Sequence, residues 1–124
     1  MSADLVGILQ VAIPVKDIER ATAFYRDILE LQFLMNGPKM AFFACGGTRI
    51  YLDANPGIAE AGGNSLIYFR ATNIDSTHSN LTKRGVAIHQ EPRIIASLPD
   101  RDVWLMWIRD SEGNLLGVME ERPK

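Results

Sequence analysis

The chain has 124 residues, of which 47% are hydrophobic and 23% are charged, and its formal net charge at pH 7 is −2. This length and composition predict one soluble globular domain and argue against a disordered chain, a collagen-like chain or a coiled coil. The near balance of 13 basic and 15 acidic side chains, without a basic stripe, argues against nucleic-acid binding, and no apolar stretch is long enough to span a membrane.

The cysteine content and the start of the chain indicate the cellular compartment. A single cysteine, Cys45, excludes an internal disulfide and a multi-cysteine zinc site. The first residues, Met1 to Asp4, lack the basic-then-apolar pattern of a secretory signal. A reducing, cytoplasmic location is therefore expected.

The first half of the chain predicts a strand, a helix and three more strands. Leu5–Val15 is apolar on both faces, which predicts a strand covered on both sides. Asp17 is a candidate N-cap for an amphipathic helix whose apolar positions run from Ile18 to Ile28 at spacings of three and four. The strands that follow are predicted at Gln32–Asn36, Lys39–Cys45 and Thr48–Ala54, the last two joined by Gly46-Gly47.

The second half repeats this order. A strand at Ser65–Ala71 precedes a helix that begins after Asn73 and stops at Gly85. A strand at Val86–Gln90 is predicted to end at Pro92, followed by an apolar loop, Arg93–Asp100, which packs on its own core, covers a pocket or contacts a second subunit. The final strands are predicted at Asp102–Arg109 and Leu115–Glu120, with a turn at 110–114 between them.

The chain therefore consists of the unit βαβββ twice, with equivalent helix starts at Ile18 and Ile74. A repeated supersecondary unit predicts two similar halves that share a cavity. We place module one at about residues 5–54 and module two at about 64–121 of a single α+β domain spanning residues 1–124.

Four stretches carry a family resemblance: Leu9–Ala21, Phe24–Leu29, Tyr68–Asp75 and Arg109–Leu115. In this order they resemble the vicinal oxygen chelate (VOC) superfamily of glyoxalases, bleomycin resistance proteins and extradiol dioxygenases. The resemblance implies two βαβββ modules forming a U-shaped mixed sheet, whose concave face binds a ligand and often a divalent metal, and it implies a homodimer. One departure is Glu30, where the family usually has a glycine that ends the first helix.

The resemblance also implies where metal ligands would lie. Metal-using members place histidines and carboxylates at the positions that are Gln10, Tyr51, Leu66 and Gly117 here. An amide is a weak ligand, a tyrosine has a reference pKa of about 10, and leucine and glycine offer no side-chain donor. Neither His78 nor His89 is placed to replace them, and Cys45 is expected to be a small buried residue. We therefore expect no metal and no other cofactor.

Strand alternation predicts which side chains line the concave face instead. It is expected to be aromatic and apolar with a few polar groups, which suits a small, flat, partly apolar organic ligand. Arg49 or Arg70 is expected to pair with an anionic oxygen of the ligand, or else to be a solvated strand end. Trp107 is assigned to the pocket and Trp104 to the helix side. The predicted ligand contacts are Gln10, Arg49, Tyr51, Leu66, Tyr68, Arg70, Trp107 and Gly117.

Three functions agree with this pattern. The first is a metal-free small-molecule binding protein. The second is an enzyme, either a metal-dependent lyase, isomerase or dioxygenase of glyoxalase type or a metal-independent enzyme, with Tyr51, Tyr68 and Asp53 as acid–base candidates. The third is a non-catalytic dimeric remnant, whose pocket would be too small for a ligand.

Overall fold

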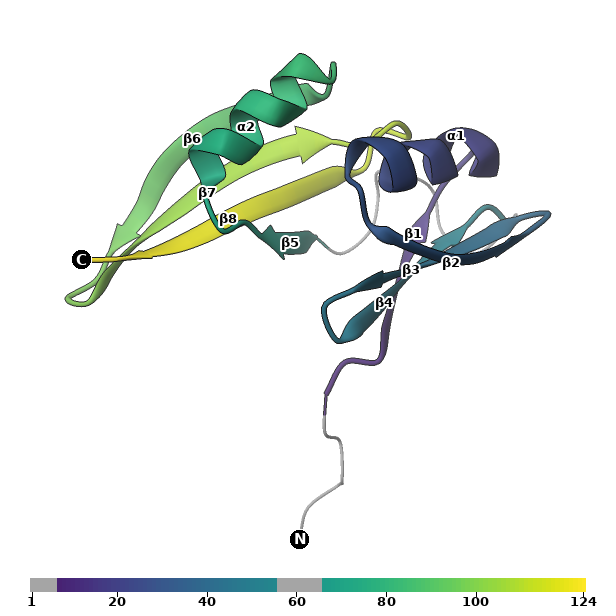
Figure 1. The fold of residues 1–124 in the computed structure, drawn as a ribbon, viewed down its shortest axis with the longest axis horizontal. Helices are drawn as coiled ribbons and strands as arrows, with labels where there is room; N and C mark the ends of the chain where they lie inside the picture. Colours follow the sequence, from purple (N-terminus) through teal and green to yellow (C-terminus); the bar gives the residue numbers. More distant parts are fainter. Residues whose placement is uncertain (1–6, 56–65) are drawn as a thin grey trace, which may run out of the picture. The chain divides into compact units, whose positions relative to one another are not determined.

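The computed structural model describes residues 7–55 and 66–124, and the chain divides into two units, residues 1–61 and 62–124. Each unit has a four-stranded mixed sheet and its own helix (Figure 1). From here on, module one and module two denote these two units, in place of the approximate bounds predicted above. Among the described residues, no helix is long and apolar enough to cross a membrane.

Module one has its strands in the order β1-β4-β3-β2. Strand β1 is parallel to β4, and the pairs β3–β4 and β2–β3 are antiparallel. Its elements are β1 (Gln10–Pro14), α1 (Ile18–Ala23), the π-helical turn η1 (Phe24–Ile28), β2 (Gln32–Gly37), β3 (Met40–Cys45) and β4 (Thr48–Asp53).

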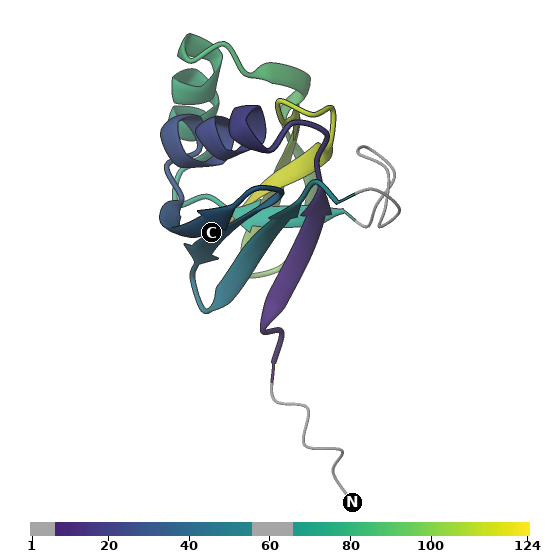
Figure 2. The same cartoon turned by 90° about the vertical axis from the view of Figure 1, so that its right-hand side faces the viewer.

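The core of module one lies between its helix and one face of its sheet (Figure 2). Tyr25 and Phe43 are fully buried, and their ring centroids lie 6.1 Å apart. The backbone N–H of Arg20 donates to the Asp17 carboxylate at 3.0 Å, which confirms Asp17 as the N-cap. Strand alternation places the other face of the sheet, with Tyr51, opposite this core.

The helix of module one ends at a residue with an unusual backbone. Glu30 has a φ of 59°, the only positive φ at a non-glycine residue among the described parts of the chain. This is the left-handed region that glycine adopts without steric cost. The structure thus keeps the turn that the expected glycine would make, although a glutamate occupies it.

Module two has the matching strand order β5-β8-β7-β6, with β5 parallel to β8 and the other pairs antiparallel. The identical order and pairing confirm the repeated βαβββ unit and the α+β class. Its elements are β5 (Ile67–Arg70), α2 (Ile74–Lys83), β6 (Ala87–Ser97), β7 (Arg101–Arg109) and β8 (Leu115–Pro123).

The core of module two lies between α2 and the sheet that this helix crosses (Figure 1). Ile74 on the helix is fully buried, as are Met106 and Ile108 on β7. The side chain of Asn73 accepts hydrogen bonds from the first turn of α2, which confirms Asn73 as the N-cap. The Glu120 carboxylate adds a second bond at the same end, because it accepts from the backbone N–H of Ile74 at 2.8 Å.

The predicted end of a strand at Pro92 is wrong. Strand β6 continues through Pro92 to Ser97, so residues 93–97 are not part of a loop. β6 is the edge strand of its sheet, where a proline without an N–H is tolerated. The register between β6 and β7 shifts at three places, and these β-bulges accommodate the residues of β6 that have no register partner on β7.

The predicted extent of the first strand is also wrong. β1 begins at Gln10, not at Leu5, and Ile8 and Leu9 are 69% and 72% exposed. The reason is the hairpin at Gly46-Gly47: β4 starts at Thr48, and because Arg49 is the register partner of Gln10, Gly7 and Ile8 have no register partner on β4. Leu5 and Val6 lie outside the described residues.

Candidate functional site

The open face of module one carries a cluster of polar and aromatic side chains. Gln10 and Arg49 are register partners on β1 and β4, and the Arg49 Nε donates to Gln10 Oε1 at 2.7 Å. The Tyr51 ring stacks on Phe42 of β3 with centroids 4.8 Å apart and an interplanar angle of 14°. The Arg49 guanidinium lies 5.5 Å from the centroid of Phe42. Three of the predicted contacts are therefore neighbours on one face.

Asp53, an acid–base candidate on the same strand, has a structural role. It is buried, and its Oδ1 accepts hydrogen bonds from the backbone N–H and the side-chain amide of Asn55, at 2.9 Å and 2.8 Å. A carboxylate engaged in this way closes the turn after β4.

The open face of module two centres on Gly117 of β8. Tyr68 of β5 and Trp107 of β7 are its register partners on either side, and their ring centroids lie 5.2 Å apart. A Cβ atom at residue 117 would lie 2.8 Å from Tyr68 Cδ2 and 3.1 Å from Trp107 Cζ3. Glycine is therefore needed here because two aromatic rings meet above the strand. Tyr68 is 49% exposed, so this aromatic surface is open.

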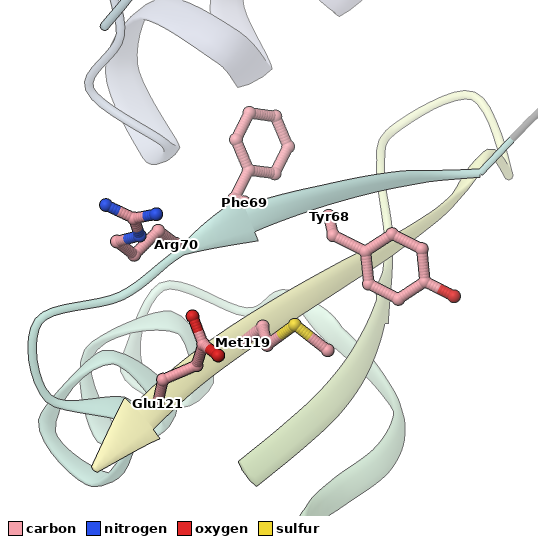
Figure 3. A pocket seen from close by; sticks show the side chains of 5 residues that line it. All are labelled: Tyr68, Phe69, Arg70, Met119 and Glu121. Carbon is pink, nitrogen blue, oxygen red and sulfur yellow. The ribbon is translucent and has the colours of Figure 1, made fainter. Parts of the chain in front are cut away.

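A hollow of about 140 Å³ lies beside this aromatic pair, along β5 and the end of β8. Its lining residues are Tyr68, Phe69, Arg70, Met119 and Glu121. Figure 3 shows the charged groups of Arg70 and Glu121 at one end of the hollow and the Tyr68 ring and Met119 thioether at the other. The hollow thus has one charged end and one apolar end.

Glu121 and Phe69 were missed by the sequence analysis. Glu121 was excluded because β8 was predicted to end at Glu120, whereas the strand continues to Pro123. Glu121 has the parity of Gly117 and Met119, so a correct strand end would have identified it. Phe69 has the opposite parity, and no alternation pattern would have placed it at the hollow, which extends around the edge strand β5.

The two tryptophans lie on opposite faces of β7, as the alternation predicts. Trp107 lies on the open face with Gly117, whereas Trp104 shares a face with the buried Met106 and Ile108. The guanidinium of Arg122 lies 4.8 Å from the Trp104 ring centroid.

The four positions expected to hold metal ligands offer few donor atoms. The amide oxygen of Gln10 already accepts from the Arg49 guanidinium, whose positive charge would repel a divalent cation at that oxygen. Leu66 precedes β5 and is 48% exposed without a donor atom, and Gly117 has no side chain. Within residues 7–55 and 66–124, no group of three His, Cys, Asp or Glu side chains is placed to hold a metal ion.

The remaining histidines and the cysteine have other surroundings. The Nε2 of His78 on α2 lies 3.8 Å from a carboxylate oxygen of Glu91, and His89 is exposed on β6. Cys45 is only half-buried, which corrects the prediction of a buried residue. Its partial burial raises the pKa of the thiol, which keeps it protonated at neutral pH and weakly nucleophilic.

The chain is similar to known proteins along most of its length. A family model described as Glyoxalase/Bleomycin resistance protein/Dioxygenase superfamily matches residues 7–118. The uncharacterized protein YraH of Bacillus subtilis (strain 168) is 27% identical, and the match covers 90% of this chain and 95% of YraH.

Two solved structures share the fold. A lactoylglutathione lyase from Agrobacterium tumefaciens is 25% identical, with a TM-score of 0.73 over 94% of this chain and 95% of the lyase. TnmS3, an antibiotic binding protein from Streptomyces sp. CB03234, is 23% identical, with a TM-score of 0.77 over 97% of this chain and 99% of TnmS3. Together with the repeated βαβββ unit and the family match, these likenesses establish that the chain belongs to the Glyoxalase/Bleomycin resistance protein/Dioxygenase superfamily.

Proposed function

We propose that this protein binds a small, partly apolar organic ligand and does so without a divalent metal. The observation that carries the proposal is the pair Tyr68 and Trp107 above Gly117, an open aromatic surface with a hollow beside it. In this proposal the aromatic surface takes the ring of the ligand, and nearby polar groups orient it.

The metal-free part of the proposal rests on the donor atoms. Zinc, nickel, iron and manganese are held by several imidazole, carboxylate or thiolate groups that converge. Of the four positions implied by the resemblance, only Gln10 and Tyr51 carry an oxygen, and the Gln10 oxygen is engaged by Arg49. We infer that the metal ligands of the family have been replaced in this chain.

The fold alone does not decide between binding and catalysis, since both a lactoylglutathione lyase and an antibiotic binding protein share it. A metal-dependent lyase, isomerase or dioxygenase is the alternative. The lack of strong metal-donor side chains at Gln10, Tyr51, Leu66 and Gly117 favours binding.

Metal analysis tests the first half of the proposal. The purified protein is incubated with nickel, zinc, iron and manganese in turn, desalted and analysed by mass spectrometry of the elements. We expect well below one metal ion per chain. Stoichiometric retention, or turnover of a glutathione hemithioacetal or a catechol that stops on chelation, would establish the alternative.

Fluorescence tests the second half. The chain has two tryptophans, so Trp104→Phe leaves Trp107 as the only reporter, and it lies on the proposed surface. We expect saturable quenching by planar aromatic compounds and a weaker affinity in the Tyr68→Ala variant. Calorimetry on the unaltered chain checks the affinities. A panel of single- and double-ring compounds that gives neither heat nor quenching would favour the non-catalytic remnant.

Three parts of the sequence analysis stay predictions: that the eight named residues contact one ligand, that the protein is a homodimer, and that it is cytoplasmic. Light scattering during gel filtration tests the dimer.

A further inference from the structure

The sequence analysis could not choose between Arg49 and Arg70 as the partner of an anionic ligand. Their surroundings in the structure distinguish them. The Arg49 guanidinium is already engaged, because its Nε donates to Gln10 and its plane lies near the Phe42 ring. Arg70 is exposed and lines the hollow of module two. Within the described parts of the chain, no hydrogen bond or ion pair to the Arg70 side chain is found. Arg70 is therefore the arginine that is available to a ligand.

The acidic residue in the same hollow is already paired. Glu121 Oε2 accepts a hydrogen bond from the Arg101 Nε at 2.9 Å. The positive charge of Arg101 on β7 therefore offsets much of the negative charge of Glu121 on the neighbouring β8. Arg70 has no such compensation. The charged end of the hollow consequently favours an anion over a cation.

The apolar end of the hollow fits a single aromatic ring. The Tyr68 ring and the Met119 thioether form its wall, and both groups make favourable contacts with aromatic faces or edges. The whole hollow, its charged end included, has a volume of about 140 Å³ and is open to solvent, whereas a closed, dry cavity of about 150 Å³ holds one benzene molecule. The hollow is therefore of a size for one ring and not for a larger ring system.

We propose that module two binds a small aromatic carboxylate, with the carboxylate on the Arg70 guanidinium and the ring against Tyr68 and Met119 (Figure 3). A guanidinium offers two parallel N–H donors to the two oxygens of a carboxylate, which a lysine or an amide cannot reproduce. This inference rests on the proposed function and adds the class of ligand and the residue that selects it.

The test compares three probes of one shape on the full chain by calorimetry: phenylacetate, its neutral amide phenylacetamide, and the cation phenethylamine. We expect phenylacetate to bind about tenfold or more tighter than the amide, which is the ratio that a charge-assisted hydrogen-bond pair gives, and we expect phenethylamine to bind weakest. Arg70→Gln is expected to abolish the preference for the acid, and Arg70→Lys to retain part of it. Arg84→Gln, at an exposed arginine that does not line the hollow, is the matched control and should change nothing.

Each outcome separates the inference from the proposed function. Equal affinity for phenylacetate and its amide overturns the inference while the proposed binding function stands. Tighter binding of phenethylamine also overturns it and points to Glu121. A preference for the acid that survives Arg70→Gln in a protein with unchanged circular dichroism overturns the assignment of Arg70. If none of the three probes binds, the inference is overturned, and the wider aromatic panel described above decides the function separately.

Discussion

Replacing Gly117 with alanine tests whether the aromatic pair above β8 depends on the missing side chain. The added Cβ would lie 2.8 Å from Tyr68 Cδ2, closer than such atoms approach in folded proteins, so the Tyr68 ring must move. Tyr68 is 49% exposed, and its ring has room to swing toward solvent. The structure therefore predicts a moderate cost and not a failure to fold.

The expected magnitude is the balance of three effects. Losing the contact between Tyr68 and Trp107 costs about 0.5–1.5 kcal/mol, and residual crowding costs about 1 kcal/mol. Against these, alanine restricts the unfolded chain more than glycine, which contributes about 0.4–1 kcal/mol of stability. The net destabilisation is about 1 kcal/mol, or roughly 3–5 °C in melting temperature for a chain of this size.

The assay is urea unfolding followed by tryptophan fluorescence, which reports on module two because both tryptophans lie on β7. The same substitution is made in a Tyr68→Ala background, where the closest clash is gone. There we expect Gly117→Ala to be neutral or stabilising by about 0.5 kcal/mol, so the two sites couple by about 1–1.5 kcal/mol. Additive effects, or a Gly117→Ala protein that is more stable than the original, would refute the argument that the rings require glycine.

Three further predictions concern other parts of the fold. The Glu30→Gly variant should be about 1 kcal/mol more stable than the Glu30→Ala variant in thermal unfolding followed by circular dichroism. Both variants lack the carboxylate, and only glycine adopts a φ of 59° without strain. Equal stabilities of the two variants would contradict this reasoning. Asp110→Ala should lower the free energy of unfolding by about 2–3 kcal/mol, because the Asp110 Oδ1 accepts from the backbone N–H groups of Glu112 and Asn114, both at 2.8 Å; a loss below about 0.5 kcal/mol would show that water replaces these bonds. Hydrogen bonds from Arg122 and from the backbone of Ile74 hold the pKa of Glu120 below its usual range, so its contribution to stability is present above the unfolded pKa of about 4.3 and is lost as the pH falls through the lower folded value. Glu120→Gln should therefore flatten the fall in stability below about pH 4, and an unchanged pH profile would exclude Glu120 as its source.

Local sequence signals predicted the elements of both modules well. Asp17 and Asn73 are N-caps, as their side chains and positions indicated, and Gly46, Gly85 and Gly113 have the positive φ values that their turns require. These features depend on a few neighbouring residues, and for that reason they can be predicted without the fold. The parity of β7 likewise placed Trp104 and Trp107 on opposite faces.

The errors arise where a strand's extent depends on its neighbour. Apolar content predicted that the first strand begins at Leu5, and the proline predicted that another strand ends at Pro92. However, β4 begins at Thr48, too late to give Gly7 and Ile8 register partners, and β6 is an edge strand that tolerates a proline. The same holds for β8, whose pairing with β7 continues to Pro123 and brings Glu121 to the hollow.

The sequence by itself determined the two βαβββ modules, the family resemblance and the weak donor set at Gln10, Tyr51, Leu66 and Gly117, because these depend on residue type and on order along the chain. Only the tertiary structure decided that the Arg49 guanidinium is engaged by Gln10 whereas Arg70 lines a hollow. The physical reason is that a hydrogen bond between side chains depends on which strands pair and in which register, and Gln10 and Arg49 become neighbours only when β1 pairs with β4.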